Sequence, residues 1–186
     1  MKRFLGIVLF IALLLMSTLV SAESAVRTLI SLDDFIARYN KLMVEIEYQA
    51  TYGIDANLTN DDIFIKPGEV NDTAQVFLPD YQGGAIQLNF VKNTRYIKEI
   101  WLFLITRGPN KAPERLLELF GGLVEGAGAV KEGSDIVEVM YDLGLYKPNA
   151  FEVDKEASIL SNGINIGYRI MTFQSDLFLV GYATPE

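Results

Sequence analysis

Carboxylates are the side chains of this 186-residue sequence that could still do common enzyme chemistry. The sequence has 24 acidic residues, no histidine and no cysteine. Without histidine there is no Ser-His-Asp triad and no imidazole base. Without cysteine there is no thiol nucleophile, thiolate metal site or disulfide. What remains is paired-carboxylate catalysis, as in glycoside hydrolases, where one carboxyl acts as the acid and a second as the base or nucleophile.

Acidic residues lie close together in the sequence at three places. These pairs are Glu45 with Glu47, Asp61 with Asp62, and Glu152 with Asp154. A glycoside hydrolase holds two carboxyl groups about 5–9.5 Å apart across a cleft and raises the pKa of one of them. All three pairs lie in polar stretches, which favours solvated surface. A carboxylate-dependent hydrolase acting on an envelope polysaccharide is therefore the alternative function, and a protein without catalytic activity is the leading one.

The segment Asp55-x-Asn57-x-Thr59 resembles the start of a calcium-binding loop. Its sixth position would be Asn60 instead of glycine, and its twelfth would be Lys66 instead of glutamate. These changes remove the sharp turn and the bidentate ligand of such loops. We predict a solvated acidic loop and no cofactor. The residues that could still bind calcium weakly are Asp55, Asn57, Asp61 and Asp62.

The glycine-rich stretch 121–128 has the composition of a phosphate-binding loop but not its pattern. It lacks the Gly-Lys-Ser/Thr ending, and Lys131 stands where a third glycine would be needed. Small residues also allow close packing between elements. We predict that this stretch packs a helix closely against a sheet.

The run Ile100–Ile105 is apolar at every position. Alternation along a strand places Ile100, Leu102 and Leu104 on one face of the sheet. It places the other three residues, the candidate binding residues, on the opposite face: Trp101, Phe103 and Ile105. A sheet covered by helices on one side normally has a single apolar face. Either this strand is buried between two layers, or the second face binds a ligand or a second copy of the chain.

Four other residues extend this second apolar face if their strands have the matching phase. They are Phe77, Met171, Phe173 and Tyr182.

The spacing of apolar residues predicts the elements that would position these side chains. A helix is expected to start at Ser31, a favourable N-cap, and to end between Val44 and Tyr52, with Gly53 as a natural stop. Further helices are expected after Pro113 and from Ser134 to Gly144. The expected strands span 63–66, 73–78, 85–91, 96–106, 157–160, 164–172 and 177–182.

This order, α-β-β-β-β-α-α-β-β-β, predicts an α+β fold. Short turns between the strands predict an antiparallel sheet of about six to seven strands, with helices packed on one face.

Residues 1–22 have the features of a secretory signal peptide. Lys2 and Arg3 precede an apolar run over 4–20, and Val20-Ser21-Ala22 suits a cleavage site. The alternative is an uncleaved anchor, because the run is almost long enough to span a membrane. We predict cleavage, which leaves 23–186 as a single exported α+β domain that is periplasmic or extracellular.

The chain is acidic, with a net charge of −8. Removal of Lys2 and Arg3 with the signal leaves 14 basic and 24 acidic residues, a net charge of −10. Nucleic acids and anionic membranes bind basic surfaces, so neither is a predicted partner. We predict a non-catalytic binding or interaction protein of the bacterial envelope. Its partner would be an unknown protein or a small apolar ligand, with a homodimer as the other expected form.

Overall fold

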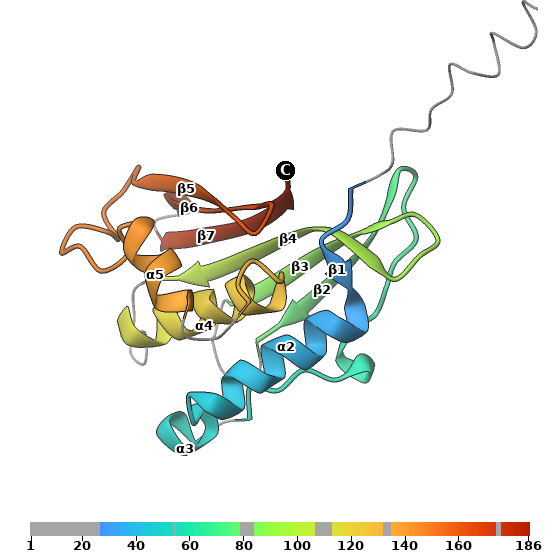
Figure 1. Cartoon of the computed structure of the whole chain (residues 1–186), viewed down its shortest axis with the longest axis horizontal. Coiled ribbons are helices and arrows are strands. Elements are labelled where there is room, and N and C mark those ends of the chain that lie inside the picture. Colours follow the sequence, from blue (N-terminus) through green and yellow to red (C-terminus); the bar gives the residue numbers. More distant parts are fainter. Residues whose placement is uncertain (1–26, 54, 79–83, 107–112, 132–134, 174–175) are drawn as a thin grey trace, which may run out of the picture.

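The fold is a two-layer α+β structure, as predicted. A computed structural model describes residues 27–53, 55–78, 84–106, 113–131, 135–173 and 176–186. In this part of the chain, a seven-stranded antiparallel sheet carries helices along one side (Figure 1). The strands are β1 (Ile30–Ser31), β2 (Asn71–Phe77), β3 (Ala85–Val91), β4 (Tyr96–Ile105), β5 (Glu156–Ser161), β6 (Ile164–Phe173) and β7 (Asp176–Pro185). The helices are α2 (Leu32–Glu45), α3 (Tyr48–Tyr52), α4 (Pro113–Gly126) and α5 (Asp135–Asp142), with a 3-10 helix at Asn60–Asp62.

Strand β4 is central to the sheet, whose order is β2-β3-β4-β7-β6-β5. Its first residues, Tyr96 and Ile97, pair with β1, and Ile100–Ile105 pair with β7. The apolar run Ile100–Ile105 therefore lies in the middle of the sheet.

The start of the described chain lies close to its C-terminus, because the Arg27 guanidinium donates a hydrogen bond to the backbone oxygen of Glu186.

The element order differs from the prediction at three places. A two-residue strand, β1, precedes the first helix. Residues 63–66 form no strand, and only Lys66 makes an isolated bridge, to Thr73. Residues 63–65 have no bridge partner, so the pairing does not extend back from Lys66. The first helix is also interrupted, because Glu47 has a left-handed backbone with φ of 51° between α2 and α3.

The predicted helix ends and one hairpin turn are confirmed. The Ser31 side chain accepts a hydrogen bond of 3.2 Å from the Asp34 N–H and caps α2. Gly53 ends α3 with φ of 75°, and Asn162 and Gly163 join β5 to β6 with φ of 49° and 75°. Positive φ at both positions is typical of a two-residue hairpin turn. Ser134 and the turn at 174–175 lie outside the described residues.

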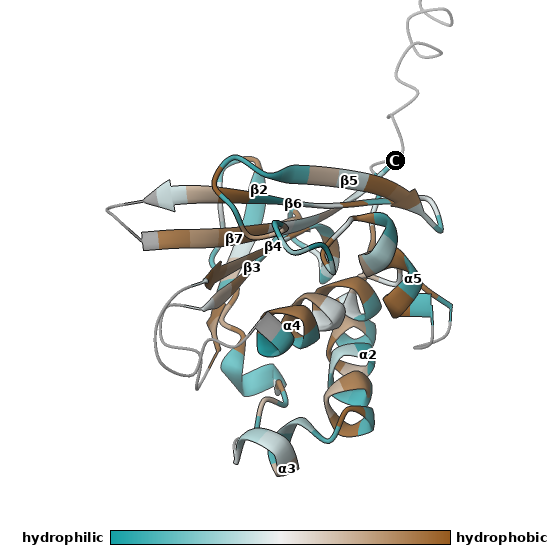
Figure 2. Cartoon of the chain, turned by 90° about the vertical axis from the view of Figure 1, so that its left-hand side faces the viewer, coloured by the Kyte–Doolittle hydropathy of each residue, from teal (hydrophilic) through white to brown (hydrophobic). Residues whose placement is uncertain are grey.

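The glycine-rich stretch packs helix α4 against helix α2, instead of against the sheet as predicted. A Cβ at Gly122 would lie 2.6 Å from the Tyr39 ring, and one at Gly126 would lie 2.6 Å from the Phe35 ring. Figure 2 shows α2 and α4 side by side beneath the sheet. Since most of the stretch is inside a helix, its backbone N–H groups serve the helix and do not form a phosphate-binding loop.

Candidate functional site

The two faces of β4 have different surroundings. Ile100, Leu102 and Leu104 are buried toward the helices and are at most 1% exposed. Trp101, Phe103 and Ile105 face the other way and are only half-buried. The alternation expected from the sequence is therefore present. In the described part of the chain, the helices cover only the first of these faces (Figure 2).

The register of the sheet adds apolar residues beside Trp101, Phe103 and Ile105. In β7, their respective partners are Tyr182, Val180 and Phe178. We call the apolar surface of these strands and β6 the outer sheet face; its residues are Trp101, Phe103, Ile105, Met171, Phe178, Val180 and Tyr182.

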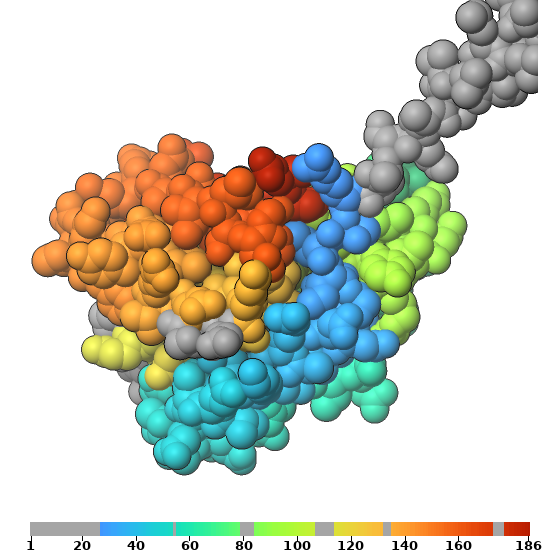
Figure 3. Space-filling model, viewed as in Figure 1, coloured from blue at the N-terminus to red at the C-terminus, as the bar shows by residue number. Residues whose placement is uncertain are grey.

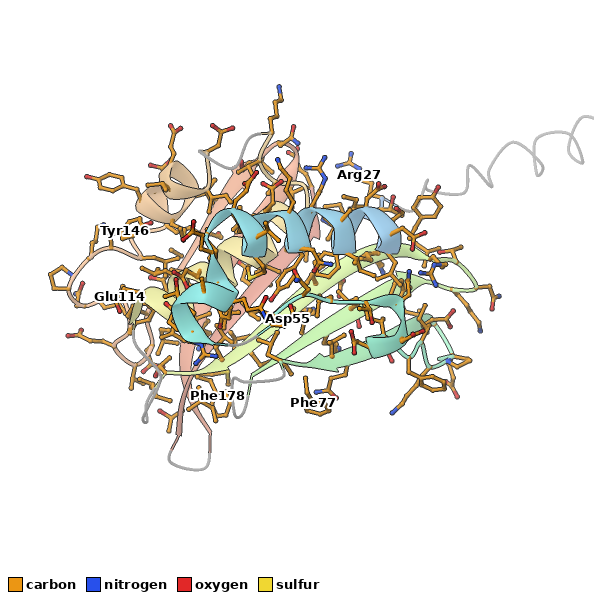
Figure 4. All side chains as sticks on the ribbon, turned by 90° about the horizontal axis from the view of Figure 1, so that it is seen from below. Arg27, Asp55, Phe77, Glu114, Tyr146 and Phe178 are labelled. Carbon is orange, nitrogen blue, oxygen red and sulfur yellow. The ribbon has the colours of Figure 1, made fainter. Side chains whose placement is uncertain are left out.

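Phe77 lies on the same side of the sheet. Its partner Ala85 pairs in turn with Phe103. Figure 4 shows Phe77 and Phe178 pointing away from α2. The side chain of Phe173 lies outside the described residues.

The outer sheet face is hollowed around Trp101 and Tyr182. Their ring centres are 5.6 Å apart, and the rings are tilted by 42°. Tyr182 lies across Gly167, where a Cβ would be 2.3 Å from the tyrosine oxygen. The hollow has a volume of about 640 Å³. Its lining consists of Trp101, Glu156, Ala157, Ser158, Tyr168, Arg169, Met171, Val180 and Tyr182.

One side of this hollow carries opposite charges. The Arg169 Nε lies 3.7 Å from the Glu156 Oε2, and both side chains are exposed to solvent. Ser158 contributes a hydroxyl to the same lining. Apolar walls with a few polar groups are typical of sites that bind small molecules. The arrangement suits a ligand that has an apolar body and a polar group.

The three acidic pairs found in the sequence lie at the surface. All six carboxylates are exposed. Asp62 serves the local turn, because its Oδ2 accepts hydrogen bonds from the Thr59 hydroxyl, at 2.6 Å, and the Thr59 N–H, at 2.8 Å. These bonds hold the pKa of Asp62 below its usual range. A general acid needs a desolvated carboxyl, which none of these pairs supplies.

The calcium candidates do not form a compact set of ligands. The Asp55 Oδ1 accepts a hydrogen bond of 3.0 Å from the Asn57 N–H, while Asp62 is engaged with Thr59. Asp61 is exposed on the 3-10 helix. Across the described ranges, no three acidic residues gather where they could hold a metal ion.

Two other carboxylates, both on α4, are shielded from solvent and were not identified from the sequence: Glu118 is half-buried and Glu125 is buried. Burial raises the pKa of both Glu118 and Glu125. Glu118 is hydrogen-bonded to Tyr52, and burial together with this bond raises the pKa of Tyr52 to about 12. Glu125 is 4% exposed, and its Oε1 lies 3.9 Å from Arg38. Glu118 and Glu125 lie seven positions apart, which is about two helical turns, so both lie on similar sides of α4. This spacing was the signal in the sequence that could have identified them.

Replacing Glu125 with glutamine is expected to stabilise the protein at pH 7 by about 1 kcal/mol, or 2–4 °C in melting temperature. The Glu125 Oε2 is buried without a hydrogen-bond partner. A carboxyl whose pKa is raised by folding costs stability as the pH rises above its unfolded value of 4.5. The gain should therefore be smaller at pH 5 than at pH 7. Thermal melts of both proteins at the two pH values measure it.

Glu138→Gln is the matched control for Glu125→Gln. Glu138 is exposed on α5, so losing its charge should change stability by less than about 0.5 kcal/mol. A lower melting temperature for Glu125→Gln at pH 7 would mean that the Arg38 ion pair stabilises the fold.

No known relative explains the outer sheet face. Among the described residues, no helix is both long and apolar enough to cross a membrane. Comparisons with protein-family models, curated proteins and solved structures found no match for this chain. The interpretation of the hollow therefore depends on its geometry.

Proposed function

We propose that this is an exported, non-catalytic binding protein of the bacterial envelope whose outer sheet face binds a small apolar ligand. The observation that carries the proposal is the hollow around Trp101 and Tyr182, which continues an apolar surface left open by the helices. Export is supported by the apolar run 4–20 after Lys2 and Arg3. The binding role is supported by the apolar lining of the hollow, whereas the six paired carboxylates are exposed at the surface.

The size and lining of the hollow favour a small ligand. Its volume of about 640 Å³ lies within the range of about 300–1,000 Å³ for small-molecule sites. Each Å² of apolar surface that a ligand covers contributes about 25 cal/mol before the entropic cost of binding. Arg169, Glu156 and Ser158 would orient a polar group of the ligand at one side.

Trp101→Ala is expected to weaken binding of an apolar dye, N-phenyl-1-naphthylamine, by about tenfold or more, because the ring forms one wall of the hollow. Dye fluorescence measures the affinity of each protein. Trp101 is the single tryptophan of the sequence, so in the unmodified protein its emission should also fall as the dye binds.

Two variants separate loss of the site from loss of the fold. Met171→Glu places a charge in the hollow at a side chain that is 40% exposed, and should weaken dye binding without unfolding the protein. Tyr141→Ala, at an exposed position on α5, should leave dye binding unchanged. Unchanged binding in both Trp101→Ala and Met171→Glu would contradict the proposed site. A shift of Trp101 emission with protein concentration, without dye, would instead identify a second copy as the occupant.

A further inference from the structure

A second apolar groove lies on the helical side of the molecule, between α2, α4 and α5. Its volume is about 310 Å³. Gly121 lies in its lining, where a Cβ would be 3.3 Å from Ile136 and 3.6 Å from Leu42. Val137 and Tyr146 border the groove and are 57% and 46% exposed. We call it the helix groove; in Figure 3, α2 is blue and α5 is orange.

One end of the helix groove is acidic. Glu114 and Glu118 line it, and Figure 4 shows Glu114 at the same end of the molecule as Tyr146. The Glu118 Oε2 is buried and has no hydrogen-bond partner. An unsatisfied buried acceptor costs about 1–3 kcal/mol, and more when it is charged. A cationic donor arriving in the groove would satisfy it.

The neighbouring base Arg115 acts on Glu118, where its charge lowers the pKa against the effect of burial, and it also contacts two tyrosines. The Arg115 Nε donates a hydrogen bond of 2.7 Å to the Tyr48 hydroxyl. Its guanidinium also lies 5.0 Å from the centre of the Tyr52 ring. The groove therefore combines apolar walls with a carboxylate oxygen that the described part of the protein leaves unsatisfied.

The charge of the surrounding helices limits what can occupy the groove. Helices α2, α4 and α5 together carry nine acidic and three basic residues. Like charges oppose the approach of a second copy of this surface, and they also oppose anionic lipid headgroups. Charge complementarity favours a partner that is both apolar and basic.

We infer that the helix groove binds an apolar, basic α-helical segment of another protein, with a lysine or arginine of that segment at Glu118. The volume of about 310 Å³ is at the lower limit for small-molecule sites, which suits a few side chains projected from a helix. Helix-in-groove recognition supplies such side chains from successive turns. This surface is separate from the outer sheet face and does not depend on the function proposed there.

A synthetic amphipathic peptide of leucine and lysine, about 14 residues long, tests the inference with the intact protein. Titration calorimetry should show binding of this peptide, and none of the matched peptide that has glutamate in place of lysine. Val137→Arg adds bulk and positive charge at the exposed rim and should lower affinity at least tenfold. Val70→Arg adds the same charge at a 77% exposed position outside the groove and should change affinity less than about twofold. Glu118→Gln should also lower affinity, by about tenfold.

Each outcome bears on the inference. Equal losses in Val137→Arg and Val70→Arg would overturn it, because binding would then follow only the net charge of the protein. Absence of binding by the lysine peptide, or equal binding of both peptides, would also overturn it. Trp101→Ala should leave peptide binding unchanged, and a loss there would move the binding surface to the sheet and overturn the inference.

Discussion

Phe120→Ala is expected to lower the free energy of unfolding by about 3–5 kcal/mol, the largest effect of any substitution considered. The Phe120 ring is 0% exposed and meets the Tyr168 ring edge-on, with centres 6.5 Å apart. It also covers the backbone of Gly181, where a Cβ would lie 2.9 Å from the ring. Because a glycine has no side chain that could move into the vacated space, the cavity would stay open. Such a loss is large beside a typical stability of about 5–15 kcal/mol.

Urea denaturation measures this loss, and Phe64→Ala is the matched control. Phe64 is 73% exposed, so the same truncation there should cost less than about 0.5 kcal/mol. Similar values for the two variants would show that Phe120 does not join α4 to the sheet in the way described. The slope of free energy against urea should stay the same if only the native state is affected.

Gly167→Ala is expected to cost about 1–3 kcal/mol and to change the binding hollow at the same time. A Cβ at this position would lie 2.3 Å from the Tyr182 oxygen and 2.8 Å from the Ala157 carbonyl oxygen. Tyr182 would have to leave its place across the strand. Since its ring is 5.6 Å from Trp101, the emission of Trp101 should shift and dye affinity should fall.

A double-mutant cycle with Tyr182→Ala tests this cause. In that background, Gly167→Ala should cost less, by about 0.5–3 kcal/mol, because the ring that blocks the new methyl group is gone. The remaining cost would come from the Ala157 oxygen, which does not move with Tyr182. Strict additivity of the two substitutions would show that Tyr182 is not the obstacle.

Elements set by local patterns could be predicted closely. The strand expected at 85–91 is β3, because its side chains alternate and a hairpin joins it to β4. Ser31 was predictable as a cap because its bond to the Asp34 N–H lies within a single helical turn. Elements that depend on other parts of the chain were not predictable in this way. The expected strand at 63–66 is absent because a strand needs a neighbour, and only Lys66 has one.

The burial of Glu125 was not predicted, for a related reason. An acidic residue in a sequence is normally taken as solvent-exposed, because burying a charge is costly. Glu125 is nevertheless 4% exposed. Gly122 and Gly126 allow α2 and α4 to approach closely, and Glu125 of α4, which pairs with Arg38 of α2, is buried near this contact. The helical period places Glu125 on one side of α4, but only the packing of two helices that are far apart in the sequence decides that this side is buried.

The candidate binding face could also be predicted only in part from the sequence. Strand alternation, which depends only on the chemistry of a single strand, was enough to place Trp101, Phe103 and Ile105 on a common face. The hollow, in contrast, needs Tyr182 beside Trp101 and Gly167 beneath it. Trp101 and Tyr182 are brought together by the pairing of β4 with β7, whose residues lie about 80 positions apart. Local side-chain periodicity decides which way a residue points, whereas its neighbours across the sheet are decided by long-range strand pairing, which no single segment encodes.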